Sequence, residues 1–140
     1  MDRNWKTSEC NGVKMKSIFS TTWKSSKQPR KQRKYRFNSP AHIKRKFLGA
    51  HLSKELRTKY KKRGITVVKG DTVKIVRGQF KKKTGKVSKV DYQNYKVYIE
   101  GIENIKKDGN KTQIPITPSN LIITTLKLDD KKRVALLERK

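Results

Sequence analysis

The chain has 140 residues, with 38 lysines and arginines against 11 aspartates and glutamates, so its formal net charge is +27 at neutral pH. That length suits about one compact domain, and with 32% apolar and 35% charged residues the chain cannot bury a large core along its whole extent. The many like-charged side chains repel one another when the chain is compact. The composition therefore predicts a polyanionic partner, nucleic acid first and an acidic membrane surface second.

Several classes of protein are excluded by what the sequence lacks. No stretch approaches the roughly 18 apolar residues of a membrane span, and residues 1–20 have no apolar signal-peptide core, so we expect a soluble intracellular protein with no membrane partner. Cys10 is the single cysteine, and His42 and His51 are the two histidines. This set forms neither an internal disulfide nor a zinc site, and we predict no metal and no cofactor.

Enzymatic activity is also disfavoured. Acid–base or nucleophilic catalysis needs paired groups whose environments shift their pKa values, whereas the carboxylates before residue 129 are scattered singly along the chain. The glycines do not form a phosphate-binding G-x-x-x-x-G-K-[ST] loop, because Gly85-Lys86 is followed by Val87. We therefore predict no catalytic residue and no small-molecule substrate.

The charge is concentrated near the N-terminus. Residues 1–63 hold 20 basic and 3 acidic side chains, with no acid between Glu9 and Glu55. Residues 24–36 show neither helical nor strand periodicity, so we predict a basic extended arm over residues 1–36 that is disordered when free and binds phosphates. Nuclear import is a second possible use, although import signals usually span only 5 to 8 residues. The candidate phosphate-binding cations here are Lys24, Lys27, Arg30, Lys31, Arg33, Lys34 and Arg36, continued by Lys44, Arg45 and Lys46.

Aromatic residues lie among these cations. Trp23, Tyr35 and Phe37 interleave with the basic side chains. Such aromatics either stack on unpaired bases or anchor the arm on its own domain, and the sequence leaves both readings open. We include Tyr35 among the candidate RNA-binding residues, together with His42 as a hydrogen-bonding contact.

Two short helices are predicted in residues 37–64. Ser39-Pro40 offers an N-cap followed by proline at the first helical position, and the helix runs through residues 41–48 to a stop at Gly49. A second helix starts at Ser53 and ends in cations followed by Gly64, a common helix ending.

From Ile65 the apolar period changes to two, which indicates short strands. About five half-apolar strands bury one small core best by closing into a barrel, which removes exposed edges. We expect Asp71 to be a turn residue hydrogen-bonded to nearby backbone N–H groups, and residues 129–140 to form a short helical tail. The alternating positions include Val73, Ile75, Val87, Tyr95, Val97, Ile99, Ile114, Ile116, Leu121 and Ile123.

The segment of residues 70–87, GDTVKIVRGQFKKKTGKV, resembles a KOW motif. Two strands flank a basic loop hinged by Gly78 and Gly85, so the loop presents its cations to phosphates. Lys82 stands where the motif often has glycine, which predicts a different turn or a strained lysine backbone. The candidate RNA-binding residues of the loop are Arg77, Gly78, Lys81, Lys82, Lys83 and Lys86.

The flanking segments FNSPAHIKRK (37–46) and LSKELRTKY (52–60) resemble one ribosomal protein family of the large subunit, counted twenty-sixth in eukaryotes and twenty-fourth in bacteria, in its eukaryotic and archaeal form. The resemblance covers about residues 35–140. It implies an SH3-like barrel that binds large-subunit ribosomal RNA in its 5′ region, near the polypeptide exit tunnel and beside other ribosomal proteins, and assists subunit assembly. It also implies a cytoplasmic location, with nuclear passage during assembly if the source is eukaryotic.

The combined prediction is a mainly β protein with a small SH3-like barrel over residues 65–128. An N-terminal basic arm (1–36), two short helices (37–64) and a C-terminal helical tail (129–140) complete it. The alternative is a non-ribosomal KOW module of a transcription elongation factor, which binds nucleic acid and a protein partner. The arm and the family-like flanks favour the ribosomal reading.

Overall fold

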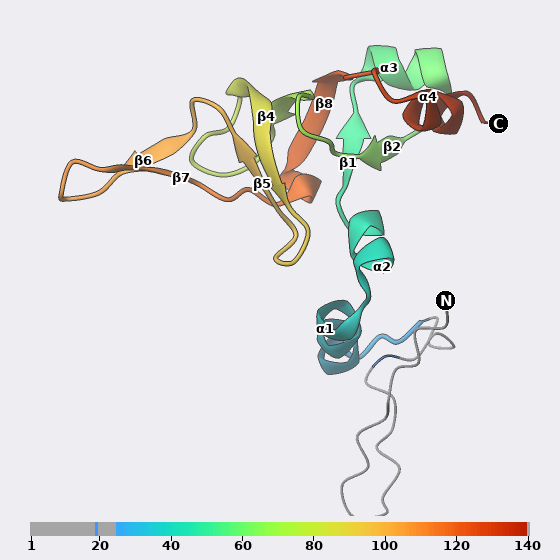
Figure 1. Cartoon of the computed structure of the whole chain (residues 1–140), viewed down its shortest axis with the longest axis horizontal. Coiled ribbons are helices and arrows are strands. Elements are labelled where there is room, and N and C mark those ends of the chain that lie inside the picture. Colours follow the sequence, from blue (N-terminus) through green and yellow to red (C-terminus); the bar gives the residue numbers. More distant parts are fainter. Residues whose placement is uncertain (1–18, 20–24, 140) are drawn as a thin grey trace, which may run out of the picture. The chain divides into compact units, whose positions relative to one another are not determined.

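The computed structural model describes residues 19 and 25–139 (Figure 1) and divides into two compact units, residues 1–39 and 40–140. The described part of the first unit contains helix α1, Pro29–Asn38. The prediction of an extended arm is wrong for this stretch. Proline at the first helical position presets the backbone angle, and the Arg, Lys and Gln residues that follow are good helix formers even without an apolar face.

The second unit begins with the two predicted helices, which are confirmed but shorter than expected. Helix α2 spans Ala41–Lys46, with Pro40 as its N-cap residue. Helix α3 spans Lys54–Tyr60, where the Ser53 side chain accepts a hydrogen bond from the backbone N–H of Leu56. Between them the chain forms a strand that the sequence analysis did not predict.

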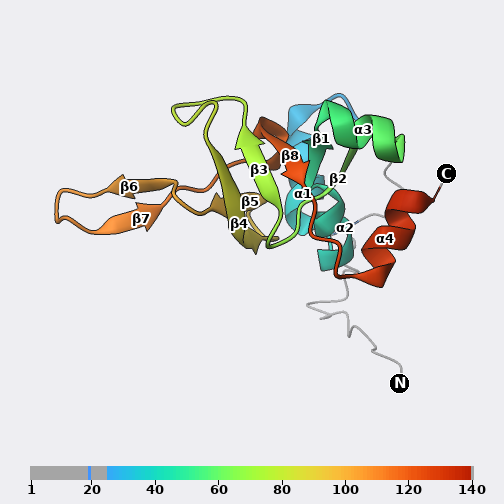
Figure 2. The same cartoon turned by 90° about the horizontal axis from the view of Figure 1, so that it is seen from above.

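The core of this unit is a six-stranded sheet (Figure 2), consistent with the predicted mainly β, SH3-like fold. Its strand order is β2-β1-β8-β3-β4-β5. Neighbours pair antiparallel except β1 and β8, which are parallel. The strands are β1 Gly49–Leu52, β2 Gly64–Thr66, β3 Thr72–Ile75, β4 Thr84–Asp91, β5 Lys96–Ile99 and β8 Leu121–Thr125.

A separate two-stranded hairpin extends beyond this sheet (Figures 1 and 2). It consists of β6, Glu103–Ile105, and β7, Lys111–Gln113, whose residues are all exposed. The alternation of Ile114 and Ile116 predicted a strand just after this hairpin. Instead, Ile116 forms an isolated bridge with Val97, and a short 3-10 turn, Pro118–Asn120, leads into β8.

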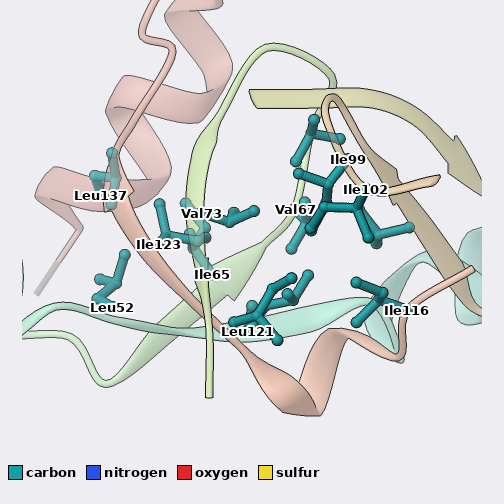
Figure 3. Packing of buried hydrophobic residues seen from close by; sticks show 14 residues of the cluster. Leu52, Ile65, Val67, Val73, Ile99, Ile102, Ile116, Leu121, Ile123 and Leu137 are labelled. Atoms are coloured by element: carbon teal, nitrogen blue, oxygen red, sulfur yellow. The ribbon is translucent and has the colours of Figure 1, made fainter. Parts of the chain in front are cut away.

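One hydrophobic cluster fills the interior of this unit (Figure 3). Val73, Ile75 and Val87 are buried in it, as the period of two predicted. Helix α4, Lys131–Glu138, is the predicted C-terminal helix and begins at the capping residue Asp130. Its Leu137 packs at one end of the cluster (Figure 3), so the tail is part of the same folded unit as the sheet.

A buried ion pair also connects α4 to the sheet. Asp71, before β3, is fully buried, and both of its carboxylate oxygens accept hydrogen bonds of 2.7 Å from the Arg133 guanidinium. The same carboxylate accepts bonds from the backbone N–H groups of Val68 and Lys127. The predicted turn role of Asp71 is therefore confirmed by its bond to Val68, and the ion pair is an additional finding.

Candidate nucleic-acid interface

The basic loop between β3 and β4 has a defined backbone. The Ile75 N–H donates to the Lys83 carbonyl, and the Lys82 N–H donates to the Ile75 carbonyl, both at 2.9 Å. Within the loop, the Lys81 N–H donates to the Gly78 carbonyl at 3.1 Å. The half-buried Phe80 packs against the hydrophobic cluster. The loop is thus held at both its base and its tip.

The cationic side chains of this loop point outward. Arg77, Lys81, Lys82 and Lys83 are all exposed, and so is Lys86 at the start of β4. Within residues 25–139, the salt bridges are Lys127–Asp129 and Arg133–Asp71, so none of the loop cations pairs with a described carboxylate. Their charges are available to an external anion.

Two glycines shape the loop in different ways. Gly78 has a φ of +96°, in the left-handed region that favours glycine. At Gly85 the reason is space, because a Cβ atom would lie 2.6 Å from Ile99 Cγ2 and 2.7 Å from the Glu100 carbonyl oxygen. Gly85 therefore serves close packing of β4 against the end of β5, whereas the sequence analysis treated it as a hinge.

Lys82 confirms the prediction of a strained lysine. Its φ is +74°, a region that costs a non-glycine residue about 1–2 kcal/mol. This conformation lies between two further lysines in the most basic part of the loop. Backbone strain of this kind tends to accumulate at functional sites.

The cations of the predicted arm are carried by α1 where the structure describes them. Arg30, Lys31, Arg33, Lys34 and Arg36 lie on this helix and are exposed. Lys27 is exposed just before it, and Lys24 lies outside the described residues. These side chains therefore lie on a basic helix, whereas the sequence analysis predicted a basic extended arm.

The aromatics of the same segment differ in their environments. Tyr35 is half-buried, and its ring centroid lies 5.0 Å from that of Phe19 within the first unit. Phe37 is 82% exposed. The contact of Tyr35 lies within the first unit, so it decides neither for base stacking nor for anchoring of the arm on the folded domain, whereas Phe37 is open to a partner.

Helix α2 carries the next group of candidate residues. His42, Arg45 and Lys46 are exposed, and Lys44 is half-buried. The guanidinium carbon of Arg45 lies 5.5 Å from the ring centroid of Tyr92, in the turn between β4 and β5. The structure therefore places Arg45 against this turn.

The sequence analysis missed a further basic region at the end of α3. A hollow of about 560 Å³ is lined only by cations and one threonine. Lys54 and Arg57 are three residues apart on α3, so they share one face, and this spacing with the run of cations at residues 61–63 just after the helix is the signal that could have identified them. The lining residues are Lys54, Arg57, Thr58, Lys61, Lys62 and Arg63.

A wider open groove of about 930 Å³ runs between α4 and strands β1 and β2. It brings the predicted cations Arg45 and Lys46 together with Arg63 and Lys132, which were not predicted. The rest of its lining is mixed, with Asp130 and apolar residues such as Ala50, Ile65 and Leu136 beside these cations. The side chain of Arg133 also lines the groove.

Two other features are absent from the part of the chain that the structure describes. Residues 19 and 25–139 contain no group of three or more His, Cys, Asp or Glu side chains that could hold a metal ion. No helix in these ranges is both long enough and apolar enough to cross a membrane.

Comparisons with known proteins identify the family. Residues 26–140 match the ribosomal protein family described as L26 in eukaryotes and L24 in archaea. The large ribosomal subunit protein uL24 of Methanocella arvoryzae is 50% identical over 116 residues, which cover 83% of this chain and 94% of that protein. The uL24 of Methanothrix thermoacetophila is 48% identical over 114 residues, covering 81% and 98% respectively. The chain therefore belongs to the family of eukaryotic L26 and archaeal L24 ribosomal proteins.

Proposed function

We propose that this protein is a structural component of the large ribosomal subunit and binds its ribosomal RNA. The observation that carries the proposal is the ordered β3–β4 loop, whose four exposed cations, like Lys86 at the start of β4, lack a carboxylate partner among the described residues. Membership of a ribosomal protein family supports the same conclusion, and two relatives are named as large-subunit proteins. The place of action is then the ribosome in the cytoplasm.

The finer proposal follows the family resemblance. The RNA site lies in the 5′ region of the large-subunit ribosomal RNA, near the polypeptide exit tunnel, and neighbouring ribosomal proteins are further partners. Binding there assists assembly of the subunit. The candidate residues fall into three groups: those on helix α1 and just before it in sequence, those on helix α2, and those of the β3–β4 loop together with Lys86 at the start of β4.

The proposed mechanism is electrostatic and depends on shape. Lysines and arginines that neutralise phosphates release the counterions condensed on the RNA, so segments of RNA that repel each other are able to approach. A-form helices have a major groove too narrow for side-chain readout. Recognition therefore rests on phosphates, 2′-hydroxyl groups and a few unpaired bases, and a loop with a fixed backbone loses little conformational entropy on binding.

The alternative of a transcription elongation module is not favoured. The family match extends far beyond the KOW segment, over residues 26–140, and it includes the two helices and the C-terminal tail. A member of a ribosomal protein family is also not expected to be an enzyme, which agrees with the scattered carboxylates.

The proposal is tested first by sucrose-gradient sedimentation of a cell lysate. Co-migration of the protein with large subunits, persisting after a high-salt wash, is the expected result. Migration at the top of the gradient, or with polymerase-sized material, would overturn it.

A binding assay tests the loop itself. The variant K81Q/K82Q/K83Q should bind large-subunit ribosomal RNA more weakly and reduce the slope of log affinity against log salt by about 2, since each phosphate contact contributes roughly 0.7–0.9. The matched control, K106Q/K107Q/K111Q, removes three charges from the β6–β7 hairpin, where Glu103 and Asp108 lie nearby in sequence. If both variants lower the slope equally, the loop has no special role.

A further inference from the structure

The turn between β4 and β5 is held unusually firmly for an exposed segment. The Asp91 carboxylate accepts hydrogen bonds from the backbone N–H groups of Gln93 and Asn94, at 2.9 and 3.1 Å, and from the Asn94 side chain at 2.9 Å. Tyr95 has a φ of +56°, in the left-handed region. Such a conformation persists only where the surroundings determine it, so the turn presents Tyr92 from a fixed backbone.

Helix α2 packs against this turn through two aromatic contacts. The rings of Phe47 and Tyr95 meet edge to face, with centroids 5.7 Å apart. The Arg45 guanidinium carbon lies 5.5 Å from the Tyr92 ring centroid, within the range of a cation–π interaction. Two elements far apart in the sequence therefore bring an arginine and a tyrosine together at the surface.

We propose that Tyr92 and Arg45 form a stacking platform for an unpaired base of the bound RNA. This inference rests on the proposed function and adds a class of contact to it. Unpaired bases in RNA stack on aromatic rings and on guanidinium planes, and this pair offers both. The sequence analysis did not identify Tyr92.

The exposure of the pair supports a role beyond internal packing. Phe47 and Tyr95, which join α2 to the turn, are half-buried, whereas Tyr92 is 39% exposed and Arg45 is also exposed. Lys46 is exposed on the same short helix and lines the same groove as Arg45. A base on the platform would thus have a cation in this region for the adjoining phosphates.

Stacking and charge predict different salt dependences, which makes the platform testable. A base on the Tyr92 ring releases no counterions, so its loss weakens binding equally at every salt concentration. Arg45 contributes both a plane and a charge, and lysine retains only the charge. The variant R45K should therefore weaken binding without changing the salt slope, whereas R45Q should weaken binding and also lower the slope by up to about 0.9.

The experiment measures the affinity of the full chain for large-subunit ribosomal RNA of the same organism at several salt concentrations. We expect Y92L to weaken binding about 5- to 100-fold with an unchanged slope, the range that base–aromatic stacking supplies. Y92F retains the ring and should bind within about twofold of the wild type. I105A, which truncates a side chain that is 67% exposed on the hairpin, is the matched control and should bind as the wild type does.

Urea unfolding of each variant separates stacking from folding. If Y92L unfolds at a lower urea concentration than the wild type, the affinity of R45K decides the question, because R45K changes an exposed helical side chain and keeps its charge. Wild-type affinity in both Y92L and R45K would overturn the platform while leaving the proposed function intact. Absence of salt-dependent RNA binding by the wild type would overturn both.

Discussion

Replacing Arg133 by methionine tests how α4 is held to the sheet. The guanidinium supplies two of the four hydrogen bonds that the buried Asp71 carboxylate accepts. It also donates to the Lys127 carbonyl at 2.8 Å. R133M retains an unbranched apolar side chain but leaves the carboxylate of Asp71 buried without a cation. Removing one partner of a buried pair typically costs about 3–5 kcal/mol, because an uncompensated charge stays in the interior.

We therefore expect R133M to lower the free energy of unfolding by about 3–5 kcal/mol. The assay is urea unfolding of the full chain followed by far-UV circular dichroism. D71N should cost a similar amount, and the double variant D71N/R133M should cost less than the sum of the two by about 0.5–3 kcal/mol, as expected for residues in direct contact. The loss of unfolding free energy in R133M should be nearly the same at about 0.1 and 1 M salt, a range over which screening strongly weakens exposed ion pairs.

Two results would refute this reasoning. A loss below about 1 kcal/mol in R133M would mean that the pair behaves like an exposed salt bridge. A loss that vanishes at high salt would mean that water reaches the carboxylate. Either result would contradict the burial of Asp71, whose side chain has 0% relative exposure.

Two further predictions concern single positions. Lys82 adopts a positive φ, so K82G should raise the free energy of unfolding by about 0.5–1 kcal/mol, the relieved strain less the greater unfolded-state entropy of glycine. Urea unfolding measures this gain in stability. A K82G variant less stable than the wild type would show that contacts of the lysine side chain outweigh its backbone strain. Hydrogen bonds from the Asn94 side chain and from the Asn94 and Gln93 backbone N–H groups hold the pKa of Asp91 below its ordinary value, with a smaller contribution from Lys89. Because the folded-state pKa is the lower one, this stabilisation is present above the unfolded-state pKa of about 3.9 and is lost as the pH falls through the folded-state pKa. Titration of the Asp91 carboxyl carbon by NMR should show a midpoint below the ordinary value for aspartate. D91N should remove this part of the decline in stability below about pH 4. An ordinary midpoint for Asp91 would contradict the hydrogen bonding of the turn.

The features that the sequence predicted correctly are those with a strong local signal. Alternation placed Val73, Ile75 and Val87 in the core, and Ser53 marked the start of α3. The comparison of Lys82 with the usual glycine of the motif predicted its backbone strain. Each of these signals depends on residues close together in the chain.

The features that were missed depend on tertiary context or on weak local signals. Gly49 was interpreted as a helix stop, but it begins β1, whose pairing with β2 and β8 comes from residues elsewhere in the chain. Helix α1 has no apolar stripe, so a search for periodicity could not find it. Tyr92 lies in a turn, where sequence alone did not indicate its contact with Arg45.

The position of the charge explains how a chain of net charge +27 maintains a folded unit. Apart from the paired Arg133, the buried side chains of residues 40–139 are apolar, or belong to Asp71. The cations of α1, α2, α3 and the β3–β4 loop lie almost entirely at the surface, where water solvates them but mutual repulsion still opposes compaction. A polyanion that binds only the folded state relieves this repulsion and adds its binding free energy to stability. Under the proposed function, the surface charge that weakens the isolated protein would stabilise its complex with RNA, which would link folding to binding.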